Sequence, residues 1–167
     1  MSDSAMQSIS MHINGVMSAV QADPGKPLVD LLREDMGLLG THVGCRNGDC
    51  GACTVLIDGA AYKSCILPAG RAANRHVETL DGLSKPSELH PVQRIFWEKN
   101  AFQCGFCLSG HILCLVALFR KDPHAGRKEI EDALAGNLCR CTGYQQIMAA
   151  ALSAAEAVQR TNSEGRG

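Results

Sequence analysis

The 167-residue sequence is poor in aromatic residues, with one Trp, two Tyr and four Phe, so its core must rest mainly on aliphatic side chains. It has no run of about eighteen apolar residues, which argues against membrane insertion. Lysine and arginine form no basic run and the formal net charge is -1, so no nucleic acid partner is expected. The first residues lack the basic region and apolar core of a secretory signal, which predicts a cytoplasmic protein.

Signatures of substrate chemistry are also missing. The six histidines show no HExxH or other paired spacing, so metal binding by histidine is not expected. No glycine-rich stretch matches a phosphate-binding loop or a dinucleotide fingerprint. No serine or cysteine is matched with a base for nucleophilic catalysis. We therefore expect no catalytic residue and no substrate site in this chain.

What the sequence has in excess is cysteine. Nine cysteines in this length are a strong deviation, and clustered cysteines in a reducing compartment indicate metal binding rather than disulfides. Eight of them fall into two clusters. The ninth, Cys114, lies on the same helical face as Cys107. It is either a reserve ligand or redox thiol or, in the interpretation we favour, a small buried hydrophobe.

The first cluster lies in GCRNGDCGACTVLIDG, with the spacing C-x4-C-x2-C and a fourth cysteine eleven residues later. Its members are Cys45, Cys50, Cys53 and Cys65. This is the plant-ferredoxin arrangement for a [2Fe–2S] cluster, in which each iron takes two thiolates. Gly44, Gly48 and Gly51 permit a tight loop that aims backbone N–H groups at the sulfurs. Zinc, which more often uses two separated short pairs, is the alternative.

The second cluster combines CGFC with CRC, thirty-one residues apart. Its members are Cys104, Cys107, Cys139 and Cys141. We predict that each pair stands at the start of a helix, where free N–H groups and the helix dipole favour thiolates and an anionic cluster. The spacing alone also allows zinc.

The first half of the sequence predicts a small β-grasp-like α+β domain. Two hairpins turn at Asn14-Gly15 and Asp58-Gly59, which readily take positive φ. The expected strands are residues 9–13, 16–20, 54–57 and 60–66. Between the hairpins, Leu28, Leu31 and Leu32 predict a short helix over residues 27–35.

The second half has helical periodicity instead. Apolar stripes predict helices around residues 91–99, 109–121, 130–138 and 144–158. Four amphipathic helices with short connections favour a four-helix bundle. The polar, turn-rich DGLSKPSE segment separates the halves into domains of residues 1–80 and 81–167. The polar tail after residue 158 is expected to be mobile.

These motifs together match a known pattern. GCRNGDCGACTVLIDG, the Ser-Cys pair at 64–65, QCGFC and GNLCRCTGYQQI resemble the small iron–sulfur subunit of the molybdenum hydroxylase (xanthine dehydrogenase) family, in order and spacing, over residues 7–158. The resemblance implies a plant-ferredoxin-like domain with one [2Fe–2S] cluster, followed by a four-helix bundle with another. It implies eight metal ligands, Cys45, Cys50, Cys53, Cys65, Cys104, Cys107, Cys139 and Cys141.

The same resemblance implies the partners. A large subunit would carry molybdopterin with molybdenum, and a medium subunit would carry FAD. Gln103 and Cys141 would contact the pterin, although Gln103 could instead be a solvated helix-cap residue. Arg140 either pairs with an acidic group or the partner chain, or is a plain surface arginine. Many relatives continue CGFC with Thr-Pro-Gly, where this chain has Leu108-Ser109-Gly110, so its contact with the large subunit is expected to differ.

The predicted function is electron transfer in an oxidoreductase complex. Electrons would leave the molybdopterin centre, pass through the two clusters and reach FAD or another acceptor. The complex would hydroxylate a small substrate with oxygen from water, such as an N-heteroaromatic compound, a purine, an aldehyde or carbon monoxide. A self-standing ferredoxin-like carrier and a zinc-stabilised interaction module are the alternatives.

Overall fold

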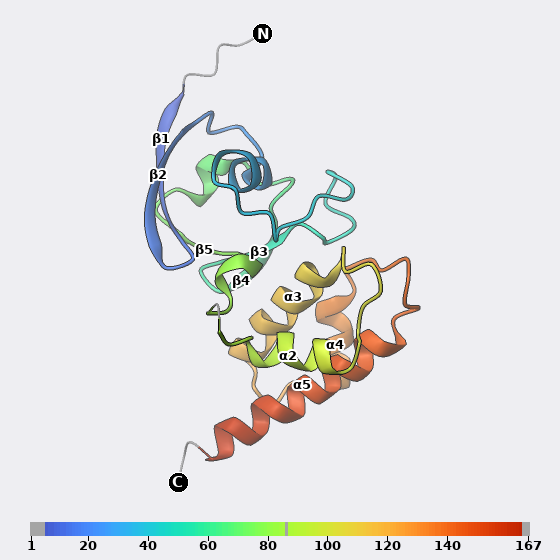
Figure 1. Ribbon diagram of the computed structural model, residues 1–167. Helices are drawn as coiled ribbons and strands as arrows, with labels where there is room; N and C mark the ends of the chain where they lie inside the picture. Colours follow the sequence, from blue (N-terminus) through green and yellow to red (C-terminus); the bar gives the residue numbers. More distant parts are fainter. Residues whose placement is uncertain (1–5, 86, 165–167) are drawn as a thin grey trace.

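The computed structural model describes residues 6–85 and 87–164, which form a sheet half and a helical half (Figure 1). The sheet half has five strands in the order β2-β1-β5-β3-β4. They are β1 (Gln7–Ile13), β2 (Val16–Ala22), β3 (Thr54–Ile57), β4 (Ala60–Lys63) and β5 (His76–Glu78). Its helical elements are α1 (Leu28–Asp30), the π-helical turn η1 (Leu31–Asp35) and the 3-10 turns η2 (Ala69–Ala72) and η3 (Leu80–Gly82).

Both predicted hairpins are present. Asn14 and Gly15 have φ values of 51° and 83°, and Asp58 and Gly59 have 49° and 83°, as type I′ turns require. The second return strand is shorter than predicted, because β4 ends at Lys63. The chain beyond it pairs with α1 instead of β3: the carbonyls of residues 64 and 67 accept from the N–H groups of residues 29 and 28.

The third strand of the sheet, β5, was not predicted. It runs parallel to β1 and antiparallel to β3, and so joins the two hairpins into one sheet. Only Val77 of its three residues is buried, which is too little alternation to reveal a strand in the sequence.

The helical half contains the four predicted helices. They are α2 (Pro91–Glu98), α3 (Leu108–Lys121), α4 (Arg127–Leu134) and α5 (Gln145–Glu164). One apolar core joins them, with Phe96, Ile112, Ile130 and Ile147 at or near full burial. Leu56 of β3 belongs to this core as well, so the sheet packs directly on α3 (Figure 1). Among the described residues, no helix has the length and apolar character needed to cross a membrane.

Three helix boundaries differ from the prediction, because the third helix also begins at Arg127 rather than at residue 130. The third helix ends at Leu134, where the N–H of Asn137 turns back to the Leu134 carbonyl, so Leu138 lies outside it and is 55% exposed. The last helix continues through Glu164, so most of the predicted mobile tail is helical. Residues 165–167 of that tail lie outside the described residues.

Candidate metal centres

The first cysteine set is shaped by the loop between η1 and β3. Arg46, Gly48 and Gly51 have positive φ values of 61°, 90° and 76°, which fold the loop tightly. The backbone N–H of Cys50 lies 3.4 Å from Cys45 Sγ. The side chains pair as Cys45 with Cys50 and Cys53 with Cys65, within hydrogen-bond reach. The loop and the residue pair that follows β4 therefore place the four predicted residues in two side-chain pairs.

Backbone N–H groups determine the electrostatics of this set. Those of Cys50 and Asn47 donate toward Cys45 Sγ and lower the pKa of this thiol to about 6. Burial raises the pKa of Cys65 to about 11, against a donation from the Gly48 N–H. Cys45 thus readily ionises to a thiolate, whereas the buried Cys65 needs a bound cation to hold its thiolate form.

The second set is formed by the segment before α3 and the loop between α4 and α5. Cys104 Sγ and Cys141 Sγ are 3.6 Å apart, and the Cys107 and Cys139 side chains are within hydrogen-bond reach. Cys107 is the N-cap residue of α3, as predicted, and burial raises the pKa of its thiol to about 12. The prediction for the other pair is wrong: α5 begins only at Gln145, so Cys139 and Cys141 lie in the loop before it.

The sulfur pairing bears on the kind of metal site. A single zinc ion needs all four sulfurs around one point. In a [2Fe–2S] cluster each iron takes only two thiolates, and two sulfurs on one tetrahedral metal lie about 3.8 Å apart. Two sulfur pairs in each set therefore fit a two-iron cluster.

The loops of the two sets are in direct contact. They lie on the same side of the molecule (Figure 1), and the N–H of Leu138 donates to the Cys50 carbonyl over 2.9 Å. The Ser109 hydroxyl donates to the Ala52 carbonyl over 3.2 Å. Each bond joins a residue of the first loop to a residue within two positions of a cysteine of the second set.

Two glycines make this approach possible, in a role that the sequence alone did not predict. A Cβ on Gly110 would lie 2.2 Å from the Gly51 carbonyl oxygen, and one on Gly51 would lie 1.9 Å from Asn137 Oδ1. The glycine hydrogens therefore point at oxygen acceptors, as in weak C–H···O contacts. The sequence signal for this role was Gly110, which stands in the first turn of a predicted helix. Glycine inside a helix costs about 1 kcal/mol relative to alanine, so its presence there indicates a packing reason.

The hydroxyl of Ser109 gives a first prediction. We expect Ser109→Ala to lower the free energy of unfolding by about 1–2 kcal/mol, because the buried Ala52 carbonyl loses its donor. Urea unfolding of the cluster-loaded protein measures the change. Ser18→Ala on β2, where the hydroxyl bond is exposed, should change it by less than about 0.5 kcal/mol. Equal effects of both substitutions would contradict the role of Ser109.

Cys114, Gln103 and Arg140 differ in their exposure to solvent. Cys114 is buried, and its Sγ accepts from Asn137 Nδ2 over 3.0 Å, which agrees with a packed side chain. Gln103 is exposed and lies outside the helices. Arg140 is exposed between Cys139 and Cys141.

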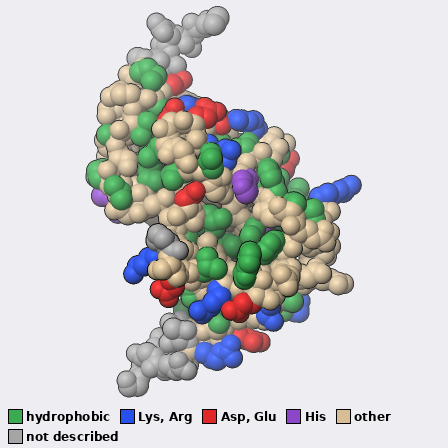
Figure 2. Space-filling model, viewed as in Figure 1, with side chains coloured by type: hydrophobic (Ala, Val, Ile, Leu, Met, Phe, Trp, Pro, Cys, Tyr) green, Lys and Arg blue, Asp and Glu red, His purple; other side chains and the backbone are tan. Residues whose placement is uncertain are grey.

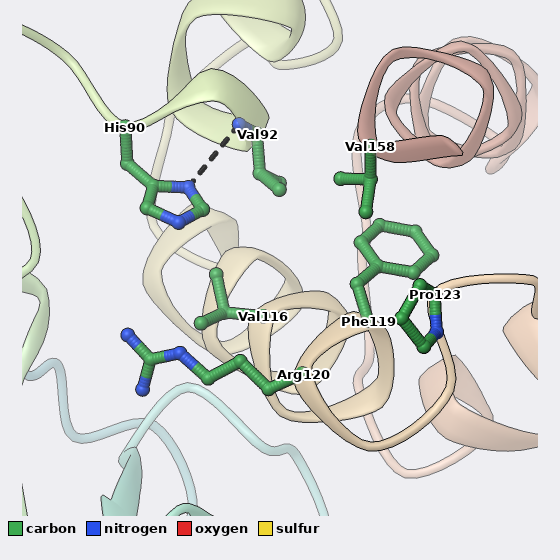
Figure 3. A pocket seen from close by; sticks show the side chains of 7 residues that line it. All are labelled: His90, Val92, Val116, Phe119, Arg120, Pro123 and Val158. Atoms are coloured by element: carbon green, nitrogen blue, oxygen red, sulfur yellow. Dashed lines mark hydrogen bonds between the residues drawn. The ribbon is translucent and has the colours of Figure 1, made fainter. Parts of the chain in front are cut away.

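A cavity of about 290 Å³ opens at the other end of α3 (Figure 3). Its lining residues are His90, Val92, Val116, Phe119, Arg120, Pro123 and Val158. His90 Nδ1 points to the Val92 N–H and accepts its hydrogen bond, which caps α2. Phe119 is twelve residues from Cys107 along α3, or about 18 Å, so the cavity is separate from the cysteine sets.

Comparisons with known proteins agree with this geometry. Residues 11–80 match the 2Fe-2S iron-sulfur cluster binding domain, and residues 79–152 match the [2Fe-2S] binding domain. The chain is 45% identical to the xanthine dehydrogenase iron-sulfur-binding subunit of Escherichia coli O157:H7, over 89% of this chain and 94% of that protein. It is 44% identical to the 6-hydroxypseudooxynicotine dehydrogenase complex subunit beta of Paenarthrobacter nicotinovorans, over 87% and 92%. The chain belongs to the family of small iron–sulfur subunits of the molybdenum hydroxylases.

A solved structure extends this family relationship to the fold. Quinoline 2-oxidoreductase from Pseudomonas putida 86 has a chain that aligns with a TM-score of 0.88 and 41% identity, over 94% of this chain and 98% of that one. The small iron–sulfur subunit described here is therefore an α+β protein with a ferredoxin-like sheet half and a helical half, and it is an electron carrier of the oxidoreductase type.

Proposed function

We propose that this iron–sulfur subunit receives electrons from the molybdopterin centre of a large subunit and delivers them to FAD of a medium subunit or to another acceptor. One observation carries the proposal: each of two cysteine sets forms two sulfur pairs, and the loops that hold the sets touch through the Leu138 N–H and the Cys50 carbonyl. When bound, a [2Fe–2S] cluster accepts and releases one electron.

The proposed ligands follow from the pairs. The plant-type set consists of Cys45, Cys50, Cys53 and Cys65. The second set consists of Cys104, Cys107, Cys139 and Cys141. The Leu138 N–H donates to the carbonyl of Cys50, and Leu138 directly precedes Cys139 in the chain. One hydrogen bond and one residue therefore connect Cys50 of the plant-type set to Cys139 of the second set. Such a short, packed connection supports electron exchange inside this chain.

Exposure supports an orientation for the subunit. Cys104 and Cys141 are exposed, as is Gln103, whereas Cys53 and Cys65 are buried. We therefore propose that the second set faces the large subunit, where Gln103 and Cys141 would contact the pterin. The plant-type set would then lie on the outgoing side.

Apolar surface supports the presence of partner subunits. Ile66, Phe106 and Leu138 each adjoin a proposed ligand and are 59%, 46% and 55% exposed. Hydrophobic side chains also reach the surface of the helical half in Figure 2. Large apolar residues beside a redox centre are expected where another chain covers them.

The names of the relatives support a substrate class. The relatives compared above are named for xanthine, quinoline and 6-hydroxypseudooxynicotine, and other relatives are aldehyde oxidoreductases. We propose hydroxylation of a small substrate such as an N-heteroaromatic compound, a purine, an aldehyde or carbon monoxide, with oxygen from water, in a cytoplasmic heterotrimer. This chain would supply the electron path and no substrate contact.

We further propose that the two halves are separate domains, residues 1–80 and 81–167, and that the second is a four-helix bundle. Two hydrophobic clusters support the division, one centred on the sheet and one on α2 to α5. The four helices contact one another in several pairs around the second cluster.

Metal and sulfide analysis of the complex purified from its native host tests the proposed function. We expect about four irons and four acid-labile sulfides per chain, about one molybdenum and two distinct EPR signals after reduction. Iron without molybdenum or a large partner would favour a self-standing carrier. Zinc in place of iron would contradict the proposal.

A further inference from the structure

Lys63 is the last residue of β4, and its side chain reaches between the two cysteine loops. The ammonium donates a hydrogen bond to the carbonyl of Gly136, three residues before Cys139. A Cβ on Gly51, which lies between Cys50 and Cys53 in the chain, would be 2.7 Å from Lys63 Nζ. One cationic group therefore lies beside the loop of each set.

Among the described residues, no carboxylate pairs with Lys63. The seven ion pairs found there involve Lys26, Lys128 and four arginines, and none involves Lys63. The side chain is half-buried, which limits screening by water. Its field reaches α3. Burial raises the pKa of the Cys114 thiol, while the hydrogen bond from Asn137 and the charge of Lys63 each act to lower it.

Reduction of an iron–sulfur cluster adds one negative charge. A cation nearby stabilises the reduced form, and cluster potentials depend on local charge and hydrogen bonding. We propose that Lys63 raises the reduction potentials of both clusters. This inference rests on the proposed electron-transfer function. Lys63 acts through its field and the loop contact, so it is a tuning residue rather than a ligand.

Three substitutions separate charge from contact. Lys63→Gln keeps a donor for the Gly136 carbonyl but removes the charge. Lys63→Met removes both, and Lys63→Arg keeps both. Lys128→Gln is the matched control, because Lys128 is a surface lysine paired with Asp132 on α4.

The measurement is an EPR-monitored redox titration of the purified complex. For Lys63→Gln and Lys63→Met we expect both potentials to fall. The ratio of reduced to oxidised plant-type cluster at a fixed potential should fall at least threefold, which is about 30 mV for a one-electron couple. Lys63→Arg and Lys128→Gln should match the wild-type complex. Unchanged potentials in Lys63→Gln, or an equal shift in Lys128→Gln, would overturn the inference.

A second variant keeps the test decisive if Lys63 is needed for folding. Ala61 is exposed and lies two residues earlier on β4, so its side chain is on the same face as that of Lys63. Ala61→Glu leaves the lysine in place and should lower the plant-type potential by offsetting its charge. An unchanged potential in this variant would count against the inference. Absence of both EPR signals from the wild-type complex would instead refute the proposed function.

Discussion

Replacement of Cys141 by serine is expected to remove the second cluster and leave the plant-type cluster in place. The Cys141 sulfur lies 3.6 Å from that of Cys104, in the pair that we assign to one iron. A serine hydroxyl is not ionised near neutral pH and is a harder ligand than a thiolate, so this iron loses its site. The iron content of the complex should fall from about four to about two per chain.

The expected spectrum is one EPR signal in place of two, with no turnover of the complex. Electrons could still be held by the plant-type set but could not reach it from the large subunit. Cys114→Ser is the matched control, because Cys114 is a buried cysteine near the second set whose Sγ is bonded to the Asn137 amide. It should keep about four irons. Equal loss of both signals in Cys141→Ser would contradict two independently folded domains.

The sequence was sufficient for features that depend on local spacing. Asn-Gly and Asp-Gly dipeptides predicted both hairpin turns, and apolar periodicity predicted all four long helices. The cysteine spacing predicted two sets of four, and the structure gathers the side chains of each set. Short-range chemistry specifies the turns, the helices and the first three cysteines of the plant-type set, whereas the second set, whose cysteine pairs are thirty-one residues apart, depended on the family resemblance.

Features that depend on contacts between distant segments could not be predicted. The strand β5 exists because β1 and β3 flank it, and only Val77 of its residues faces the core. The position of Cys139 and Cys141 in a loop before α5 depends on contacts inside that loop, where the N–H of Cys139 donates to the Tyr144 hydroxyl over 3.0 Å. The contacts of Lys63 with Gly136 and of Gly110 with Gly51 likewise join the two halves of the chain. Neither contact has a signature in residue spacing.

Gly110→Ala is expected to force the two cysteine loops apart, although helix propensity alone favours the change. Alanine stabilises a helix by about 1 kcal/mol relative to glycine. The new Cβ, however, would lie 2.2 Å from the Gly51 carbonyl oxygen, a backbone atom held by the hydrogen bonds of its own loop. Overpacking against backbone outweighs the gain, so the free energy of unfolding of the cluster-loaded protein should fall by at least about 2 kcal/mol.

The amide hydrogen of Leu138 reports the same displacement, because its bond to the Cys50 carbonyl depends on the loop contact. We expect it to exchange faster with solvent in Gly110→Ala and in Gly51→Ala. The control for the second variant is Gly37→Ala, since Gly37 has φ 71° against 76° at Gly51, but a Cβ on Gly37 would meet nothing within 4 Å. Gly37→Ala should show only the backbone cost of about 1 kcal/mol and unchanged exchange at Leu138. If Gly51→Ala behaved like Gly37→Ala, conformational preference alone would explain glycine at this position, and close approach of the loops would not.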